Sequence, residues 1–118
     1  MLKRNLQMPC RNYSEKKIET GVSKYAKSLG WSYHKYRPVN DKGFPDRFFL
    51  RDGKIIFVEF KAPGEAPNPL QWSRIMDLDL SGFDVYVIDN ENLGKRIFNS
   101  YEKKKRIKKG AKARLSMG

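Results

Sequence analysis

The sequence predicts an α/β fold in which a mixed central β-sheet is flanked by helices. Segments with helical spacing alternate with segments rich in β-formers, in the order helix, strand, hairpin, helix, strand, helix. Asp52-Gly53 lies between two runs of β-formers, the strongest short-range signal of a hairpin, because glycine accepts the positive φ of the turn. The length of 118 residues suits one domain with a single hydrophobic core.

The first helix is predicted to begin after Ser14, a good N-cap, and to end before Gly30, which suits the position after a helix. Residues 1–13 have no apolar period, and we expect them to form a loose N-terminal arm. Glu15 continues the spacing of the apolar face backwards and lies at its edge, whereas Glu19 lies one turn further along. The face itself recurs at helical spacing: Ile18, Val22, Tyr25 and Leu29.

Residues 31–36 are rich in aromatic side chains and are expected to form a strand. The lone His34 within it is interpreted as a surface or packing residue. A loop over residues 37–44 follows, and the basic residues around it are candidates for a DNA-facing rim: Lys35, Arg37 and Lys42. Solvated surface charge is the alternative interpretation of these three residues.

The register of the hairpin decides which side chains meet at its open end. Counting back from a turn formed by residues 52–53 places Asp46 across from Glu59, with Cβ atoms about 4.5–5.5 Å apart. Lys61 shares a face with Glu59, because alternate residues of a strand point to the same side. Both faces of the hairpin have apolar centres, so we expect it to be covered on both sides.

Two carboxylates held this close repel each other, and a hard divalent cation removes the conflict. Mg²⁺ prefers one or two carboxylates together with waters and phosphate oxygens, and Mn²⁺ suits the same ligands. The amine of Lys61 can then orient or deprotonate an attacking water. The competing interpretation is a surface hairpin with a Glu–Lys pair and no chemistry.

The second helix is expected to begin after an Asn68 cap and to end near Gly82. Its apolar residues spread widely around the axis, which indicates burial or contact with another subunit. A buried strand is predicted over residues 83–89. A final helix follows, capped by Asp89 or Asn90, with one apolar face: Leu93, Ile97 and Tyr101.

The spacing of the hairpin residues also resembles a known signature. Pro45-Asp46, followed after twelve residues by Glu59-Phe60-Lys61, resembles the PD-(D/E)XK nuclease motif. With Gly43-Phe44 before it and Ala62-Pro63-Gly64 and Leu70-Gln71 after it, the sequence is similar to the VRR-Nuc family (virus-type replication-repair nucleases) over roughly residues 15–89. The resemblance implies a restriction-endonuclease-like core, which we place over residues 14–101.

The resemblance also implies a role for each motif residue. Asp46 and Glu59 would hold Mg²⁺ or Mn²⁺ with help from the Phe60 carbonyl, and Lys61 would position the water. Glu15 would support the metal or its water shell, with Glu19 as the alternative acid; a mere complement to the helix dipole is the other interpretation of Glu15. Gln71 would orient the site, or would be only a polar residue of the first helical turn.

Compact members of this family resemble virus-encoded resolvases, which implies a homodimer that cuts branched DNA such as Holliday junctions. Because we see no separate target-recognition domain, we expect recognition of DNA backbone and shape over base readout. The alternatives are a non-catalytic basic nucleic-acid-binding module and a nuclease subunit of a larger replication or repair complex.

The net charge of +12 is uneven, because residues 95–118 hold ten Lys or Arg and one acid. Such charge commonly meets phosphate backbones, although a solubilising tail is the alternative for the basic extension over residues 102–118. Its candidate DNA-binding residues are Lys103, Lys104, Lys105, Arg106, Lys108 and Lys109.

The single cysteine, Cys10, excludes an internal disulfide and a cluster of Cys and His metal ligands. We therefore expect a reducing compartment, the cytoplasm, and the host cell cytoplasm if the chain is virus-encoded. No apolar run approaches the roughly 20 residues of a membrane span, and the first residues lack the apolar core of a signal peptide.

Overall fold

The computed structural model describes residues 2–37 and 42–102, with side chains from residue 15 onward. Four strands form one sheet in the order β1-β2-β3-β4, in which β1–β2 and β2–β3 are antiparallel and β3–β4 is parallel. The strands are β1 (Ser32–Lys35), β2 (Arg47–Arg51), β3 (Lys54–Phe60) and β4 (Asp84–Ile88). The predicted α/β class with a mixed sheet is confirmed.

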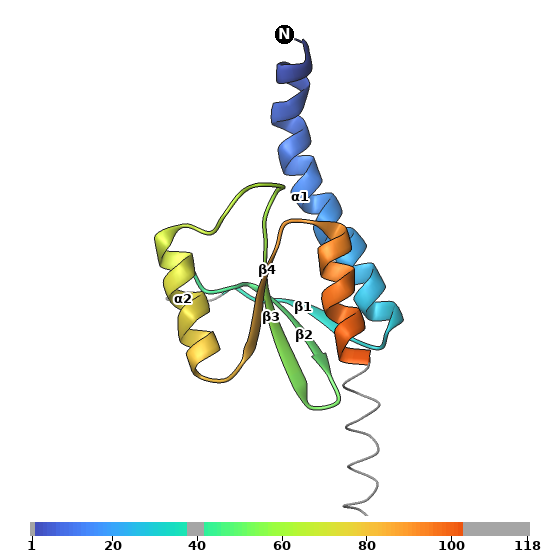
Figure 1. The fold of residues 1–118 in the computed structure, drawn as a ribbon, viewed down its shortest axis with the longest axis vertical. Helices are drawn as coiled ribbons and strands as arrows, with labels where there is room; N and C mark the ends of the chain where they lie inside the picture. Colours follow the sequence, from blue (N-terminus) through green and yellow to red (C-terminus); the bar gives the residue numbers. More distant parts are fainter. Residues whose placement is uncertain (1, 38–41, 103–118) are drawn as a thin grey trace, which may run out of the picture.

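Helices lie on both faces of this sheet (Figure 1). Helix α1 (Leu2–Ser28) and a helix that is described over residues 91–102 pack side by side on one face, while α2 (Pro69–Leu80) lies on the other. None of the helices in the described part of the chain is long and apolar enough to cross a membrane.

The hydrophobic core lies between the sheet and the pair formed by α1 and the helix over residues 91–102. Phe49 of β2 and Ile56 and Val58 of β3 are fully buried there. Phe98 packs edge to face on Phe49, with ring centroids 4.8 Å apart. The α1 side of this core is formed by Ile18, Val22 and Ala26. On the opposite sheet face lie α2 and the rings of Phe44 and Phe83, which pack edge to face on Phe57.

Gly94 brings the two packed helices close together. A Cβ atom at this position would lie 2.5 Å from Cγ2 of Val22 and 3.2 Å from Cγ2 of Ile88. Val22 and Ile88 are both fully buried, so neither can move aside. The separation of α1 from the helix over residues 91–102 therefore depends on glycine at position 94.

The β2–β3 turn has the geometry that the sequence predicts. Asp52 and Gly53 have φ angles of 51° and 77°, as a two-residue type I′ turn requires. Arg51 pairs with Lys54, and the register continues to Arg47 opposite Val58. The predicted register is confirmed over residues 47–51 and 54–58. Continuing it by one residue would pair Asp46 with Glu59.

A turn-end cluster surrounds this turn; it consists of Arg51, Lys54, Asp84, Tyr101 and Glu102. The Arg51 guanidinium is 7% exposed, lies 4.5 Å from the Trp31 ring centroid, and donates to the Leu29 carbonyl and to Glu102. Lys54 pairs with Asp84 at 3.1 Å, and Asp84 also accepts from the Tyr101 hydroxyl. These contacts fix the helix over residues 91–102 to the hairpin.

The helix ends follow their caps. Gly30 follows α1 with φ 96°, and the Trp31 amide donates to the Ala26 carbonyl, as in a Schellman motif. Asn68 caps α2 by accepting from the Gln71 amide, and Gly82 follows α2 with φ 93°. Asn90, one of the two candidate caps, accepts from the Leu93 amide.

Three predictions were wrong. Residues 2–13 are helical, not a loose arm, and Ser14 is no N-cap, because α1 runs unbroken from Leu2; most residues before position 9 are good helix formers. The hairpin is fully covered on one side only, since Phe48 and Phe57 of the α2 side remain half-buried.

The third error concerns the buried face of the last helix, which consists of Gly94, Phe98 and Tyr101 rather than Leu93, Ile97 and Tyr101. The physical reason is that the last helix approaches α1 most closely at Gly94, so the helix face that contains Gly94 is the one that packs against α1. The predicted strand over residues 83–89 is found as β4, but most of it is half-buried rather than buried.

Candidate active site

The residues of the motif lie around the open end of the β2–β3 hairpin. The Tyr36 amide donates to the Asp46 carbonyl at 2.8 Å, so Asp46 extends β2 by one residue beside β1. On its other side, Asp46 is the residue that the register places opposite Glu59. The main chain of Lys61 is fixed next to β4, because its amide donates to the Ile88 carbonyl at 3.0 Å.

Glu59 lies in a shielded position between two polar side chains. Its Oε2 accepts a hydrogen bond from Gln71 Nε2 at 3.2 Å and lies 3.6 Å from Lys61 Nζ. The Glu59 and Lys61 side chains are only 12% and 18% exposed. Burial raises the pKa of the Glu59 carboxyl above its usual value, and the nearby charges of Asp46 and Glu15 act in the same direction.

The structure thus brings Glu15 of α1 near enough to act electrostatically on Glu59, from the opposite layer of the fold. Gln71 is both a polar residue of the first turn of α2 and a hydrogen-bond partner of Glu59, the two interpretations that the sequence leaves open. Its Oε1 accepts from the Asn68 amide, which completes the cap of α2, while its Nε2 donates to Glu59. The cap of α2 therefore also orients a carboxylate of the site.

Sequence reasoning missed a polar network beside Asp46. Arg47 donates through Nε to Glu19 Oε2 at 2.8 Å and through NH1 to Asp46 Oδ1 at 2.9 Å. The Tyr33 hydroxyl also donates to Glu19. Glu19 is the alternative helix-1 acid, and it is occupied with Arg47 and Tyr33. No local signal could have found this network, because its members come from three separate elements.

A hollow of about 250 Å³ opens beside this network, lined by Glu15, Lys16, Glu19 and Arg47. It gives solvent access to the guanidinium of Arg47 and to the helix face that carries Glu15. The hollow therefore lies on the α1 side of Arg47, the neighbour of Asp46 in the chain.

Comparisons with known proteins bear on the family and the fold. No family model matches the chain. "Putative nuclease p44" of Acyrthosiphon pisum secondary endosymbiont phage 1 is 39% identical over 80 residues, which cover 67% of this chain and 86% of the phage protein. A solved VRR_NUC domain superposes with a TM-score of 0.69 at 23% identity, over 75% of this chain and 97% of that domain. This chain belongs to the VRR-Nuc family of nucleases.

The donor set of this VRR-Nuc site fits a hard divalent cation. In residues 2–37 and 42–102, no three His, Cys, Asp or Glu side chains lie close enough to hold an ion by themselves. Mg²⁺ needs no such cage, since it usually takes one or two carboxylates with waters and substrate phosphates. Asp46 and Glu59 supply two carboxylates. Burial first, and then the charges of Asp46 and Glu15, raise the pKa of Glu59, and a nearby cation would act in the opposite direction.

The predicted DNA-facing rim is exposed: Lys35, Arg37 and Lys42 all face solvent. His34, as expected, is a packing residue, which stacks on Phe48 with ring centroids 5.1 Å apart. The six predicted DNA-binding residues of the tail, from Lys103 to Lys109, lie outside the described residues, so their role stays a prediction.

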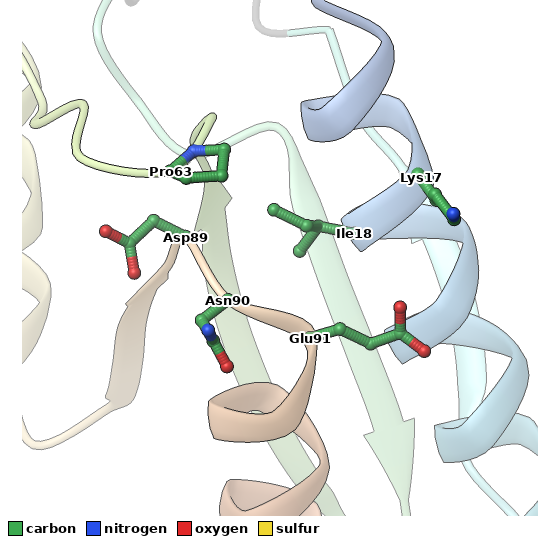
Figure 2. A pocket seen from close by; sticks show the side chains of 6 residues that line it. All are labelled: Lys17, Ile18, Pro63, Asp89, Asn90 and Glu91. Atoms are coloured by element: carbon green, nitrogen blue, oxygen red, sulfur yellow. The ribbon is translucent and has the colours of Figure 1, made fainter. Parts of the chain in front are cut away.

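A second hollow of about 280 Å³ lies where α1 meets the start of the last helix (Figure 2). Its acids are already occupied: Asp89 accepts from the Gly64 amide, and Glu91 pairs with Lys95. Figure 2 shows Glu91 pointing toward α1, where Gly21 leaves room for its carboxylate. This hollow is a gap between packed elements rather than a second reactive site.

Proposed function

We propose that this VRR-Nuc protein is a divalent-metal-dependent DNA endonuclease that hydrolyses phosphodiester bonds. The observation that supports the proposal is the hairpin register, which, continued by one residue beyond Arg47 and Val58, carries Asp46 to the position opposite Glu59. Lys61 Nζ lies 3.6 Å from Glu59 Oε2, and the charge of Asp46 acts on Glu59. Two carboxylates and an amine in this arrangement suit metal-assisted hydrolysis.

Asp46 and Glu59 would hold Mg²⁺ or Mn²⁺, with the Phe60 carbonyl as a further ligand. When bound, such an ion supplies Lewis-acid polarisation of the scissile phosphate. Lys61 Nζ would orient the attacking water or accept its proton, and Gln71 would keep Glu59 in place. Glu15 would hold the water shell on the α1 side.

The substrate that we propose is branched DNA, such as a Holliday junction. Support comes from the net charge of +12 and from the exposed rim of Lys35, Arg37 and Lys42. The single cysteine suits a reducing compartment, such as the cytoplasm of a host cell. A role in DNA repair would follow from such a substrate.

We further propose a homodimer, with two sites for the two strands of a junction. Support comes from α2, whose outer face carries Trp72, Met76 and Leu80 at helical spacing; Leu80 is 82% exposed. Sedimentation should give a dimer for the unaltered chain and a monomer for Met76→Glu. A dimer that survives both Met76→Glu and Leu80→Glu would place the contact elsewhere.

A cleavage panel tests the proposed chemistry. Linear, flap, splayed-arm and four-way DNA are incubated with Mg²⁺, with Mn²⁺ and with a chelator. We expect metal-dependent cleavage that is fastest on branched substrates. Asp46→Asn or Glu59→Gln should abolish this cleavage but leave DNA binding unchanged. Asp52→Asn is the matched control, because it makes the same change at the other end of the hairpin and asparagine accepts the φ of 51°.

The second candidate is a non-catalytic nucleic-acid-binding module, which the basic C-terminal region favours. It predicts DNA binding with no cleavage of any substrate and no calorimetric signal for Mg²⁺ or Mn²⁺. Metal binding that is lost in Asp46→Asn would reject this alternative.

A further inference from the structure

Arg47 follows the metal-site aspartate directly, yet its side chain belongs to the sheet face that α1 covers. NH1 reaches back around the strand to Asp46, where it meets the carboxylate at 2.9 Å and the main-chain carbonyl at 3.3 Å. Nε meets Glu19 of α1 at 2.8 Å. One guanidinium therefore links helix α1 to the carboxylate of Asp46.

The position of the Arg47 side chain is fixed by Glu19, which is in turn held by Tyr33. Glu19 accepts from both Arg47 and Tyr33, and its side chain is only 12% exposed. Burial alone would raise the pKa of Glu19, but the two donated hydrogen bonds outweigh it and lower that pKa. The Tyr33 ring packs on Phe49, with centroids 5.0 Å apart, so the network is anchored in the core.

Asp46 needs such a support more than Glu59 does. Its side chain is 51% exposed at the end of a strand, whereas Glu59 is shielded and held by Gln71 and Lys61. The ion pair with Arg47 engages Oδ1 of Asp46, so Oδ2 takes no part in it. The charge of Arg47 is balanced by Glu19, so it opposes a cation at Asp46 only weakly.

We propose that Arg47, held by Glu19 and Tyr33, is a positioning residue that orients the Asp46 carboxylate for a divalent cation. The inference rests on the proposed function, because it concerns the same metal site. Outer hydrogen bonds of this kind orient metal ligands, and their loss typically lowers metal affinity about 10–100-fold. The structure thereby assigns Glu19 to positioning, apart from the supporting role proposed for Glu15.

Calorimetric titration of the full chain with MnCl₂, and in parallel with MgCl₂, tests the inference without any reference to activity. We expect Arg47→Met to weaken binding about 10–100-fold. Arg96→Met is the matched control, since Arg96 is exposed on the last helix and should bind the ion as the unaltered chain does. Urea unfolding of each variant shows whether the fold is retained.

Two further variants test whether the network acts as a unit. Glu19→Gln alone should weaken metal binding, but it should add nothing in an Arg47→Met background, because the effect passes through Arg47. Tyr33→Phe keeps the ring on Phe49 and removes one donor to Glu19, so a smaller loss is expected. It also keeps the inference testable if Arg47→Met fails to fold.

The outcomes separate the inference from the proposed function. If the unaltered chain binds neither ion, or if Asp46→Asn binds as well as the unaltered chain, the metal site itself is wrong. Binding that Asp46→Asn abolishes but Arg47→Met and Tyr33→Phe leave unchanged would overturn only the inference. Tighter binding in Arg47→Met would also overturn it, because Arg47 would then be a competing cation.

Discussion

The two ends of the β2–β3 hairpin both gather charged side chains, with opposite electrostatic consequences. In the turn-end cluster, Arg51 meets Glu102 and Lys54 meets Asp84. At the open end, Asp46 and Glu59 face each other, and burial together with like charge raises the pKa of Glu59. The same pair of strands thus holds balanced charge at one end and an excess of carboxylate at the other.

This difference indicates a division of labour along about 17 Å of strand, the length of five residues. Paired charges at the turn end fix the last helix to the sheet and stabilise the fold. At the open end, the buried carboxylate of Glu59 and the like charge of Asp46 lower stability, and we propose that the same carboxylates bind a cation. Substitutions at the two ends should therefore affect different quantities.

Lys61→Ala gives the largest expected effect at the open end. We expect a loss of about 10²–10⁴-fold in single-turnover cleavage rate, because Lys61 would orient or deprotonate the water. Lys54→Ala is the matched control at the other end of β3. It should lower the free energy of unfolding, because Lys54 pairs with Asp84, and leave the cleavage rate unchanged. A loss of only a fewfold for Lys61→Ala would show that Lys61 neither orients nor deprotonates the attacking water.

Arg51→Met should have the largest effect at the turn end. The free energy of unfolding should fall by about 3–5 kcal/mol, because Glu102 loses its buried partner and the Leu29 carbonyl loses its donor. Urea unfolding measures this loss, and the cleavage rate of the folded fraction should stay unchanged. An equal loss of rate and stability would contradict the division between the two ends.

Removal of the residues beyond Glu102 tests the basic extension, which leaves the described structure at the turn end. Truncation after Glu102 keeps the pair with Arg51 and removes eight Lys or Arg. If these residues bind phosphates, the log–log salt slope of duplex affinity should fall by about 0.9 for each lost contact. Cleavage at saturating DNA should persist, and an unchanged slope would make the extension a solvated tail.

Glu59→Gln should produce the smallest effect on stability, and in the opposite direction from Arg51→Met. The pKa of Glu59 is higher in the folded chain than in the unfolded one, so the folded chain binds more protons. The contribution of Glu59 to stability is then greatest at low pH and falls as pH rises through its folded pKa. Glu59→Gln should remove this fall and raise the melting temperature at pH 7, as measured by thermal unfolding.

Local sequence chemistry was enough to predict the hairpin and its register. Asp52-Gly53 dictates the turn, and the alternation of strand side chains then places Asp46, Glu59 and Lys61. The cap at Asn68 likewise predicted the start of α2. These parts of the site depend on contacts close in sequence or on a single turn.

Arg47 and its network could not be predicted in this way. Arg47 meets Glu19 across 28 positions of sequence, and the contact exists only because α1 packs on β2. The start of α1 was missed for another reason: Ser14 and Glu15 form a plausible N-terminus, but the residues before them also favour a helix. The phase of the last helix depends on Gly94, whose effect appears only when α1 is beside it.

Gly94 also limits how this protein can be engineered. Replacing a helical glycine by alanine ordinarily stabilises a protein by about 0.5–1 kcal/mol, which makes the change attractive in thermostability campaigns. At position 94 the new methyl group would press on Val22, and α1 would have to shift outward. The alanine would therefore strain the core packing instead of raising heat resistance. The same helix carries Glu15 and Glu19, so their side chains would shift at the candidate site.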